Sequence, residues 1–246
     1  MSGHRFLDDT DEFVASSIKA LLPVLRCLSR LADLRLSGYS VEAYEGASLA
    51  AALGGLTALT ILLLCENQFG RNELGDGGIQ VLALALSHLS CMAEVLLRRN
   101  EICAAGGAAL APPLAALTML TALDLSDNPL RGDGAEALAP VLSRLSRLVY
   151  LDLGYNGMEA AAAAALAQPL SALISLTALN LRGNSFSDTG AEALAPALSR
   201  LSHLQSLAMS CNSLSDKSLV RLAPALACLA TCLSSSYWQA TSLAMQ

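Results

Sequence analysis

The 246-residue chain has few aromatic and few charged side chains: they make up 4% and 15% of it, whereas 54% is hydrophobic. A scarcity of aromatic residues suits thin, repeated layers of leucine and alanine better than one large core. A membrane helix needs an apolar run of about 18 residues, and every run of that length in this chain contains polar residues. We therefore expect no membrane span, although the mean hydropathy is +0.49.

Basic charge is also scarce, with 15 Lys and Arg against 21 Asp and Glu and a formal net charge of −6. Nucleic-acid binding needs clustered Lys and Arg, so we expect no nucleic-acid partner. No apolar signal region follows Met1, and Asp8, Asp9 and Glu12 disfavour a transit peptide. These features favour a cytoplasmic location.

Motifs for chemistry are missing as well. The seven cysteines contain no CxxC pair, and the three histidines are not spaced as metal ligands. Neither a phosphate-binding loop nor a Ser-His-Asp set is found. We expect reduced thiols, no cofactor, no metal and no enzymatic activity.

What the chain has instead is a repeat, LxxLxLxxN, whose copies at Leu120, Leu148 and Leu176 each start 28 residues after the previous one. A strict period of this length is typical of a solenoid of stacked units. One step, from Leu59 to Met92, is 33 residues long, and the extra residues are best placed at 68–72. The seven motif starts are Leu31, Leu59, Met92, Leu120, Leu148, Leu176 and Leu204.

Each unit continues with a helical stripe, as in Leu130, Gly134, Leu138 and Leu142. One repeat is thus a strand, a turn and a helix. Stacking predicts an α/β solenoid, a curved arc with parallel strands on the concave face and helices on the convex face. Residues 1–30 would form an N-terminal capping segment, residues 31–231 seven repeats, and residues 232–246 a degenerate C-terminal cap or tail.

Three residue types recur at fixed places in the unit. The ninth-position Asn, as in Asn156, is expected to bond buried backbone groups of its own and neighbouring turns. A glycine before the helix, as in Gly134, indicates positive φ or close approach. A mid-helix proline, as in Pro140, predicts helices that are kinked or broken there.

On these motifs the chain resembles the leucine-rich-repeat family, and its 28-residue helical unit is similar to the ribonuclease-inhibitor-like subfamily. The resemblance covers about residues 10 to 230. It implies an intracellular arc whose ligands often bind the concave face, and it leaves the biochemistry open because one fold serves many partners.

Strand positions 3, 5, 7 and 8 of the motif are not core positions, and position 5 is expected to face the concave solvent. Apolar, aromatic and charged side chains gather there, as they do at interfaces. The alternative is that these are ordinary solvated positions. Asp124 and Asp152 could also pair as carboxylates, which without a pocket is more often an acidic patch. The candidate partner-binding residues are Leu63, Leu96, Arg98, Arg99, Asp124, Asp127, Tyr150, Asp152, Tyr155 and Arg182.

The leading hypothesis is a non-enzymatic protein-protein interaction scaffold that binds a protein partner on the concave face, alone or as a subunit of a larger complex. Two alternatives stay open. One is a regulator of a small GTPase, resembling Ran GTPase-activating protein, which shares this repeat class. The other is the sensor domain of a nucleotide-binding leucine-rich-repeat receptor, whose nucleotide-binding switch would lie outside these residues.

Overall fold

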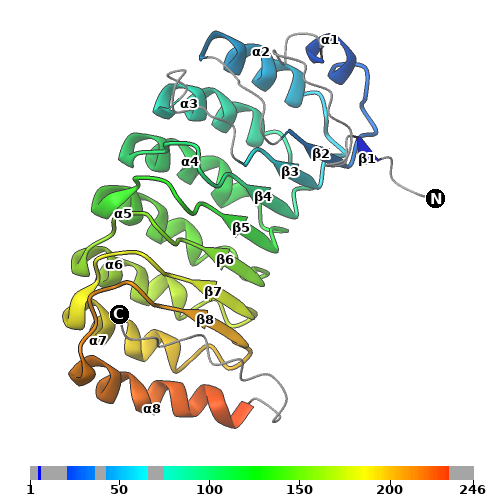
Figure 1. Ribbon diagram of the computed structural model, residues 1–246. Helices are drawn as coiled ribbons and strands as arrows, with labels where there is room; N and C mark the ends of the chain where they lie inside the picture. The colour runs from blue at the N-terminus through cyan, green and yellow to red at the C-terminus, as the bar shows by residue number, and fades with distance from the viewer. Residues whose placement is uncertain (1–4, 7–20, 37–42, 66–74, 233–246) are drawn as a thin grey trace.

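The computed structural model describes residues 5–6, 21–36, 43–65 and 75–232. Its strands form a single parallel sheet of eight strands in sequence order (Figure 1). The strands are β1 (Arg5–Phe6), β2 (Asp33–Arg35), β3 (Ile61–Leu63), β4 (Glu94–Leu96), β5 (Ala122–Asp124), β6 (Tyr150–Asp152), β7 (Ala178–Asn180) and β8 (Ser206–Ala208).

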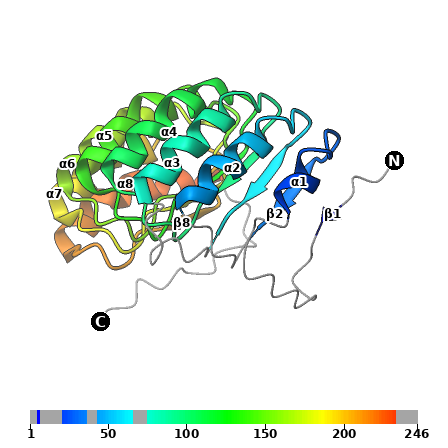
Figure 2. The ribbon, with the colours of Figure 1, turned by 90° about the horizontal axis from the view of Figure 1, so that it is seen from above.

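A helix follows each strand, and each helix packs against the next one in the chain. The helices stand together on one side of the sheet, as the view from above shows (Figure 2). They are α1 (Leu22–Leu25), α2 (Ala43–Leu53), α3 (Gly75–Leu86), α4 (Ala104–Ala116), α5 (Arg131–Leu142), α6 (Ala160–Leu170), α7 (Ser187–Leu198) and α8 (Asp216–Cys232).

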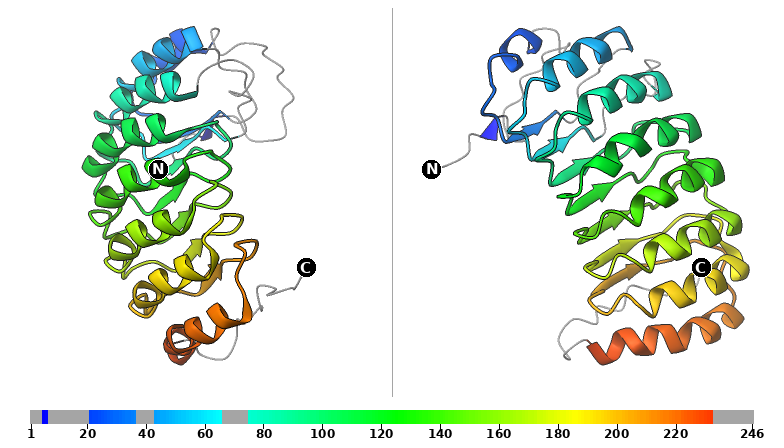
Figure 3. Two further views of the ribbon diagram at one scale, coloured as in Figure 1. Left: turned by 90° about the vertical axis from the view of Figure 1, so that its left-hand side faces the viewer. Right: turned by 180° about the vertical axis from the view of Figure 1, so that it is seen from behind.

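The stack is curved, with the strands along its shorter inner side and the helices along its longer outer side (Figures 1 and 3). The register follows the repeat, because Ala122 pairs with Tyr150 and Tyr150 with Ala178. The predicted leucine-rich-repeat solenoid with parallel strands and helices is confirmed.

The segment before the first predicted repeat also carries repeat structure. Arg5 pairs with Asp33 and Phe6 with Leu34, so β1 adds a strand one 28-residue step before β2. The short helix α1 packs against α2 at the same end of the stack. Described repeat structure therefore begins within residues 1–30.

Leucines fill the space between the sheet and the helices. The central residue of each strand from β2 to β7 is buried, with Leu62, Leu123 and Leu151 all 0% exposed. Each fully buried leucine stabilises the fold by about 1.5–3 kcal/mol relative to an exposed one. The core is a succession of equivalent layers rather than one central cluster.

The predicted asparagine ladder is confirmed. Asn128 Nδ2 donates to the carbonyls of Leu97 at 3.0 Å and Leu125 at 2.9 Å, and Oδ1 accepts the Asn100 N–H at 2.9 Å. Asn184 repeats this pattern, with Nδ2 bonded to Leu153 O and Oδ1 accepting the Asn156 N–H. The ladder thereby satisfies backbone groups of two successive repeats.

The turns after the ladder alternate between two forms. Glu101, Gly157 and Ser213 directly follow their Asn and have φ of 52°, 64° and 55°. In the intervening units the left-handed residue lies three positions after the Asn, at Arg131 and Ser187, with φ of 53° and 56°. The structural unit is thus a pair of repeats.

This alternation reaches the ladder itself. Asn128 Oδ1 and Asn184 Oδ1 accept backbone donors from the preceding unit, whereas Asn156 Oδ1 is buried without a partner among the described residues. Asn212, which follows the same turn form as Asn156, accepts within the described part of the chain only the Phe186 N–H, at 3.5 Å, so the asparagines after this form make fewer bonds.

The helices run through their prolines rather than breaking there. Pro140 lies within α5 and Pro196 within α7. The residues four positions earlier, Glu136 and Glu192, are exposed, so water can reach the carbonyls that lose an intrahelical donor.

For the recurring glycine, close approach is the reason it is needed. A Cβ on Gly190 would lie 3.0 Å from the Ala163 Cβ and 3.2 Å from the Ala160 Cα of the preceding helix. Glycine at this position lets neighbouring helices pack closely.

Among the described helices, none is long and apolar enough to cross a bilayer.

Candidate partner-binding surface

The ten candidate residues fall into two groups on the open side of the sheet. The inner wall consists of the outward-facing strand residues of β3 to β6. The carboxyl edge consists of the residues just beyond the ends of β4 to β7. The wall group holds Leu63, Leu96, Asp124, Tyr150 and Asp152, and the edge group holds Arg98, Arg99, Asp127, Tyr155 and Arg182.

The apolar part of the inner wall lies on β3 and β4. Leu63 pairs in register with Leu96, and Leu96 with Asp124. Both leucines are half-buried, and so is the neighbouring Ile61. Each keeps apolar surface on the open side of the sheet, which is where the repeat pattern predicted it.

Asp152 differs from the expectation that its strand position faces solvent, since it is only 7% exposed. Its Oδ2 accepts bonds from the Tyr150 hydroxyl at 3.1 Å and from Asn180 Nδ2 at 2.9 Å. Its Oδ1 accepts the Gly154 N–H at 2.8 Å. Asp152 thus organises neighbouring side chains, and Tyr150, 36% exposed, is the group that meets solvent there.

Asp124 is less enclosed, and its Oδ1 accepts bonds from the Ser126 N–H at 2.9 Å and Oγ at 2.6 Å. Burial raises the pKa of Asp124 above its usual 3.8, and the Asp152 charge adds to this, whereas Ser126 and Arg98 act in the opposite direction. Burial and the same two carboxylates also raise the pKa of Tyr150, so its hydroxyl stays protonated.

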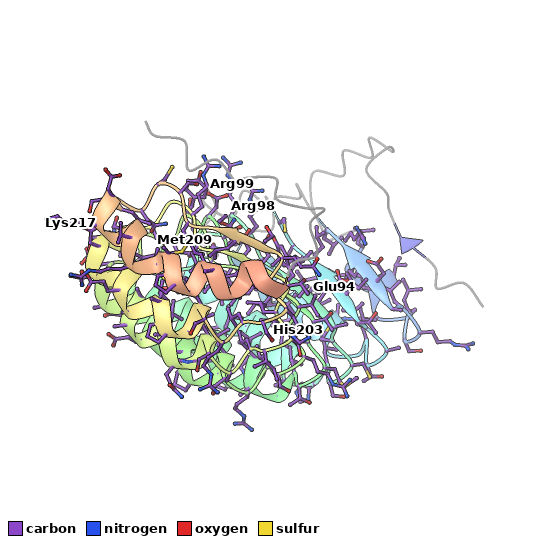
Figure 4. The ribbon with its side chains drawn as sticks, turned by 90° about the horizontal axis from the view of Figure 1, so that it is seen from below. Glu94, Arg98, Arg99, His203, Met209 and Lys217 are labelled. Carbon is purple, nitrogen blue, oxygen red and sulfur yellow. The ribbon has the colours of Figure 1, made fainter. Side chains whose placement is uncertain are left out.

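The carboxyl edge begins with two adjacent arginines. Both are exposed. Figure 4 shows them together, beyond the end of β4 that is opposite to Glu94. Arg98 Nε is 2.9 Å from Asp127 Oδ2, which joins the β4 and β5 ends. Arg99 takes a left-handed conformation with φ of 59°.

Tyr155 and Arg182 form the second half of the carboxyl edge. The Arg182 guanidinium carbon lies 5.7 Å from the centroid of the Tyr155 ring, within cation–π range. The ring lies against Gly183, where an added Cβ would collide with it. Tyr155 is 46% exposed, so it presents an aromatic surface held in place by the next repeat.

Within the described ranges, no group of three or more His, Cys, Asp and Glu residues could hold a metal. Four cysteines in the described part are free thiols: Cys27, Cys91, Cys103 and Cys211. His203 Nδ1 lies 3.0 Å from the Ile174 carbonyl oxygen at the surface. The inner wall and the carboxyl edge thus present apolar, aromatic and charged side chains that are suited to binding.

Two residues that organise this surface were not among the candidates. Asn180 holds Asp152, and Gly183 accommodates Tyr155. Both lie 28 residues after the residue that they serve, so the repeat length itself was the signal.

Comparisons with known proteins agree with this architecture. A family model described as "Leucine Rich repeat" matches residues 116–139, 172–195 and 200–223. Internalin C2 from Listeria monocytogenes has a similar structure, with TM-score 0.56, 23% identity and coverage of 84% of this chain and 72% of that one. An internalin F from the same organism gives TM-score 0.39 and 20% identity, over 80% of this chain and 60% of that one. Among curated proteins, none matches this sequence.

A single parallel sheet backed by one helix per repeat, together with the similarity to internalin C2, defines the fold as a repeat solenoid. Three stretches of the chain match the leucine-rich-repeat model, and its fold is a leucine-rich-repeat solenoid.

Proposed function

We propose that the protein is a non-enzymatic scaffold that binds a protein partner on the inner wall. The observation that carries this is the apolar surface of Leu63 and Leu96, which pair in register and are half-buried on the open side of the sheet, with Tyr150 two strands further on, in β6. Aliphatic and aromatic groups of this kind, held on a rigid framework, are typical interface anchors.

The chemistry of the wall indicates what the partner presents. An apolar element fits Ile61, Leu63 and Leu96, and a basic group next to it fits the Asp124 carboxylate on β5. Asp152 contributes by holding Tyr150 rather than by meeting the partner, because its carboxylate is already engaged.

The test is affinity capture from lysate with the wild-type protein and with a Leu63→Ser, Leu96→Ser double variant, followed by mass spectrometry. Leu84→Ser is the matched control, because Leu84 is 69% exposed on the outer helix α3. We expect a protein captured by wild type and by the control and lost by the double variant, with all three keeping the same circular dichroism. Equal capture by all three would refute the inner wall as the site.

Several finer assignments are part of this proposal. The helix in every repeat favours the ribonuclease-inhibitor-like subfamily. The acidic net charge of −6 supports a protein rather than a nucleic-acid partner, and the free thiols fit a cytoplasmic location. Among the described strands, β1 and β8 each pair on one side only, which fits a subunit of a larger complex.

One alternative has an observation in its favour. Arg99 and Arg182 are exposed at the strand ends, and an arginine supplied in this way can stabilise the charge that develops in GTP hydrolysis. A small-GTPase regulator resembling Ran GTPase-activating protein would accelerate hydrolysis in a panel of GTPases, and the scaffold would not. The receptor-sensor alternative requires a longer transcript that encodes a nucleotide-binding domain.

A further inference from the structure

The carboxyl edge carries an excess of positive charge in a chain whose net charge is −6. The Arg98 and Asp127 charges offset each other through their 2.9 Å contact. Arg99 and Arg182 are exposed, and neither is ion-paired with a carboxylate of the described residues. Two positive charges therefore remain, one at the end of β4 and one at the end of β7.

Arg182 is held in a conformation suited to binding. Its guanidinium lies over the Tyr155 ring at 5.7 Å, and Gly183 lets that ring lie flat against the next repeat. A stacked guanidinium keeps its N–H groups in the plane of the fork, where a carboxylate can accept two of them. The pair is thus ordered before a ligand arrives, which lowers the entropy cost of binding.

The spacing of the edge groups follows from the sheet. The ends of β4 and β7 are separated by three strand steps of about 4.8 Å, or about 14 Å in all. An extended peptide advances about 3.3 Å per residue, so four residues cover that span. Tyr155, beyond the end of β6, lies next to the Arg182 end, and Asp127, beyond the end of β5, lies nearer the Arg99 end.

We propose that the carboxyl edge binds an acidic segment of a partner protein that runs across the strand ends. Its two carboxylates, four positions apart, bind Arg99 and Arg182, and the apolar residue midway between them, whose side chain points to the same face, packs on Tyr155. The remaining positions are uncharged, because Asp127 repels an acid there. This inference rests on the proposed function and names a second contact for the same partner.

The experiment uses rhodamine-labelled peptides with the core Glu-Ala-Leu-Ala-Glu, whose sequence is the same in both chain directions. Fluorescence anisotropy at low salt measures their affinity for the whole protein, because salt screens exposed charges. We expect Arg182→Ala and Arg99→Asn each to weaken binding about fivefold, the equivalent of about 1 kcal/mol. Asparagine is chosen at position 99 because it tolerates the left-handed backbone there.

Arg144→Ala is the matched control, since Arg144 is an exposed arginine just beyond α5 on the outer side. It should leave the affinity unchanged. A peptide with both acids replaced by Lys, one with its acids two positions apart and one of five consecutive Glu should all bind more weakly. Equal binding of these peptides, unchanged affinity in the Arg99 and Arg182 variants, or tighter binding of a ten-nucleotide single-stranded DNA would overturn the proposal.

The two proposals fail separately. The Leu63→Ser, Leu96→Ser variant should bind the peptide as wild type does, because neither leucine belongs to the carboxyl edge. Loss of peptide binding in the arginine variants alone supports the edge site. Peptide binding without any wall-dependent capture would refute the inner wall and leave the edge site standing.

Discussion

The Tyr155 ring lies against the backbone of Gly183 in the next repeat, where a Cβ would stand 2.5 Å from the ring Cε1 atom. Tyr155, Asp127 and Cys211 occupy the equivalent turn position in other units and also have positive φ, so a side chain is tolerated there in general. What excludes one at Gly183 is the neighbouring tyrosine.

Gly183→Ala should therefore destabilise the protein and displace Tyr155. The left-handed backbone costs about 1–2 kcal/mol, and the collision adds about 1–3 kcal/mol. Gly157→Ala is the control, because φ is 64° there but the nearest atom to its Cβ is 3.9 Å away. Urea unfolding should give a clearly lower midpoint for the Gly183 variant than for the Gly157 variant. Equal midpoints would show that the ring does not need the glycine.

Asn156→Ala should destabilise more than Asn180→Ala. The Asn156 side chain is 0% exposed, and its Nδ2 bonds the carbonyls of Leu125 and Gly154. Leaving them unpaired costs about 1–3 kcal/mol. Asn180 is half-buried, and its Nδ2 donates to Asp152. When the Asn180 side chain is removed, the Asp152 carboxylate still accepts bonds from two other donors. Comparable urea midpoints for the two variants would contradict this difference.

Asn184→Ala should be costlier still. The side chain uses both ends, since Oδ1 also accepts the N–H groups of Asn156 and Met158. Asn156 Oδ1 has no such donors among the described residues. The order of midpoints should be Asn180→Ala, then Asn156→Ala, then Asn184→Ala, from highest to lowest. An Asn184 variant as stable as the Asn156 variant would mean that the turn form does not affect the ladder.

The strands, their parallel order and the leucine core could be predicted from the sequence, because each depends on one repeated pattern. The strand at Arg5–Phe6 was harder to find, since only its 28-residue distance from Asp33 marks it. The two turn forms could not be predicted, because units of both forms share the same LxxLxLxxN motif. The difference lies in backbone angles just beyond it, at residues such as Glu101 and Arg131.

The candidate surface was predicted by position and not by environment. The pattern placed Leu63, Asp124 and Asp152 in one column, but not the burial that separates Asp152 from the others. That burial comes from lateral contacts with Tyr150 and Asn180 on the same and the next strand. Predicting such contacts requires a comparison of the side chains at equivalent positions of adjacent repeats, as well as of those along one strand.

Asp124→Asn should stabilise the protein at neutral pH. Burial raises the folded-state pKa of Asp124 above 3.8, so the folded state binds this proton more tightly than the unfolded chain does. The free energy of unfolding therefore decreases as the pH rises above 3.8. The asparagine variant has no carboxyl to ionise, so it avoids this decrease, and its own Oδ1 can still accept a hydrogen bond from Ser126. The gain in Tm over wild type should be present at pH 7 and disappear below pH 3.8.

Asp188→Asn is the opposite case. Bonds from Ser215 lower the pKa of Asp188, so it contributes stability above its ordinary value of 3.8 that is lost as the pH falls through the lower folded value. Its variant should have a lower Tm than wild type at pH 7, with the difference shrinking in acid. Shifts of the same sign in the two variants would contradict the assignment of their environments.

Gly132→Asp should stabilise the start of α6. Asp76 Oδ1 caps the following helix, α4, by accepting the N–H groups of Cys103 at 2.9 Å and Gly106 at 2.7 Å. Gly132 lies 56 residues after Asp76 in the same register, with nothing within 4 Å of an added Cβ. The new carboxylate should cap Glu159 and Ala162 and add about 0.5–1 kcal/mol.

Gly77→Asp is the control for the new cap, because its site is equally open and matches the register of Asp133, which bonds no helix start among the described contacts. It should give a smaller increase in Tm than Gly132→Asp. An equal increase in Tm for both variants would mean that the loss of a glycine lowers the backbone entropy of the unfolded chain, and that capping is not the cause.

The central claim, that the inner wall binds a protein partner, is tested most directly by site-specific photo-crosslinking. A benzophenone amino acid is placed at Leu96 on the wall, or at Leu84 on the outer helix, and the protein is irradiated in lysate. We expect a discrete protein adduct from position 96, absent when Leu63→Ser is added, and no matching adduct from position 84. An adduct from position 84 with none from position 96 would contradict it and assign binding to the helices.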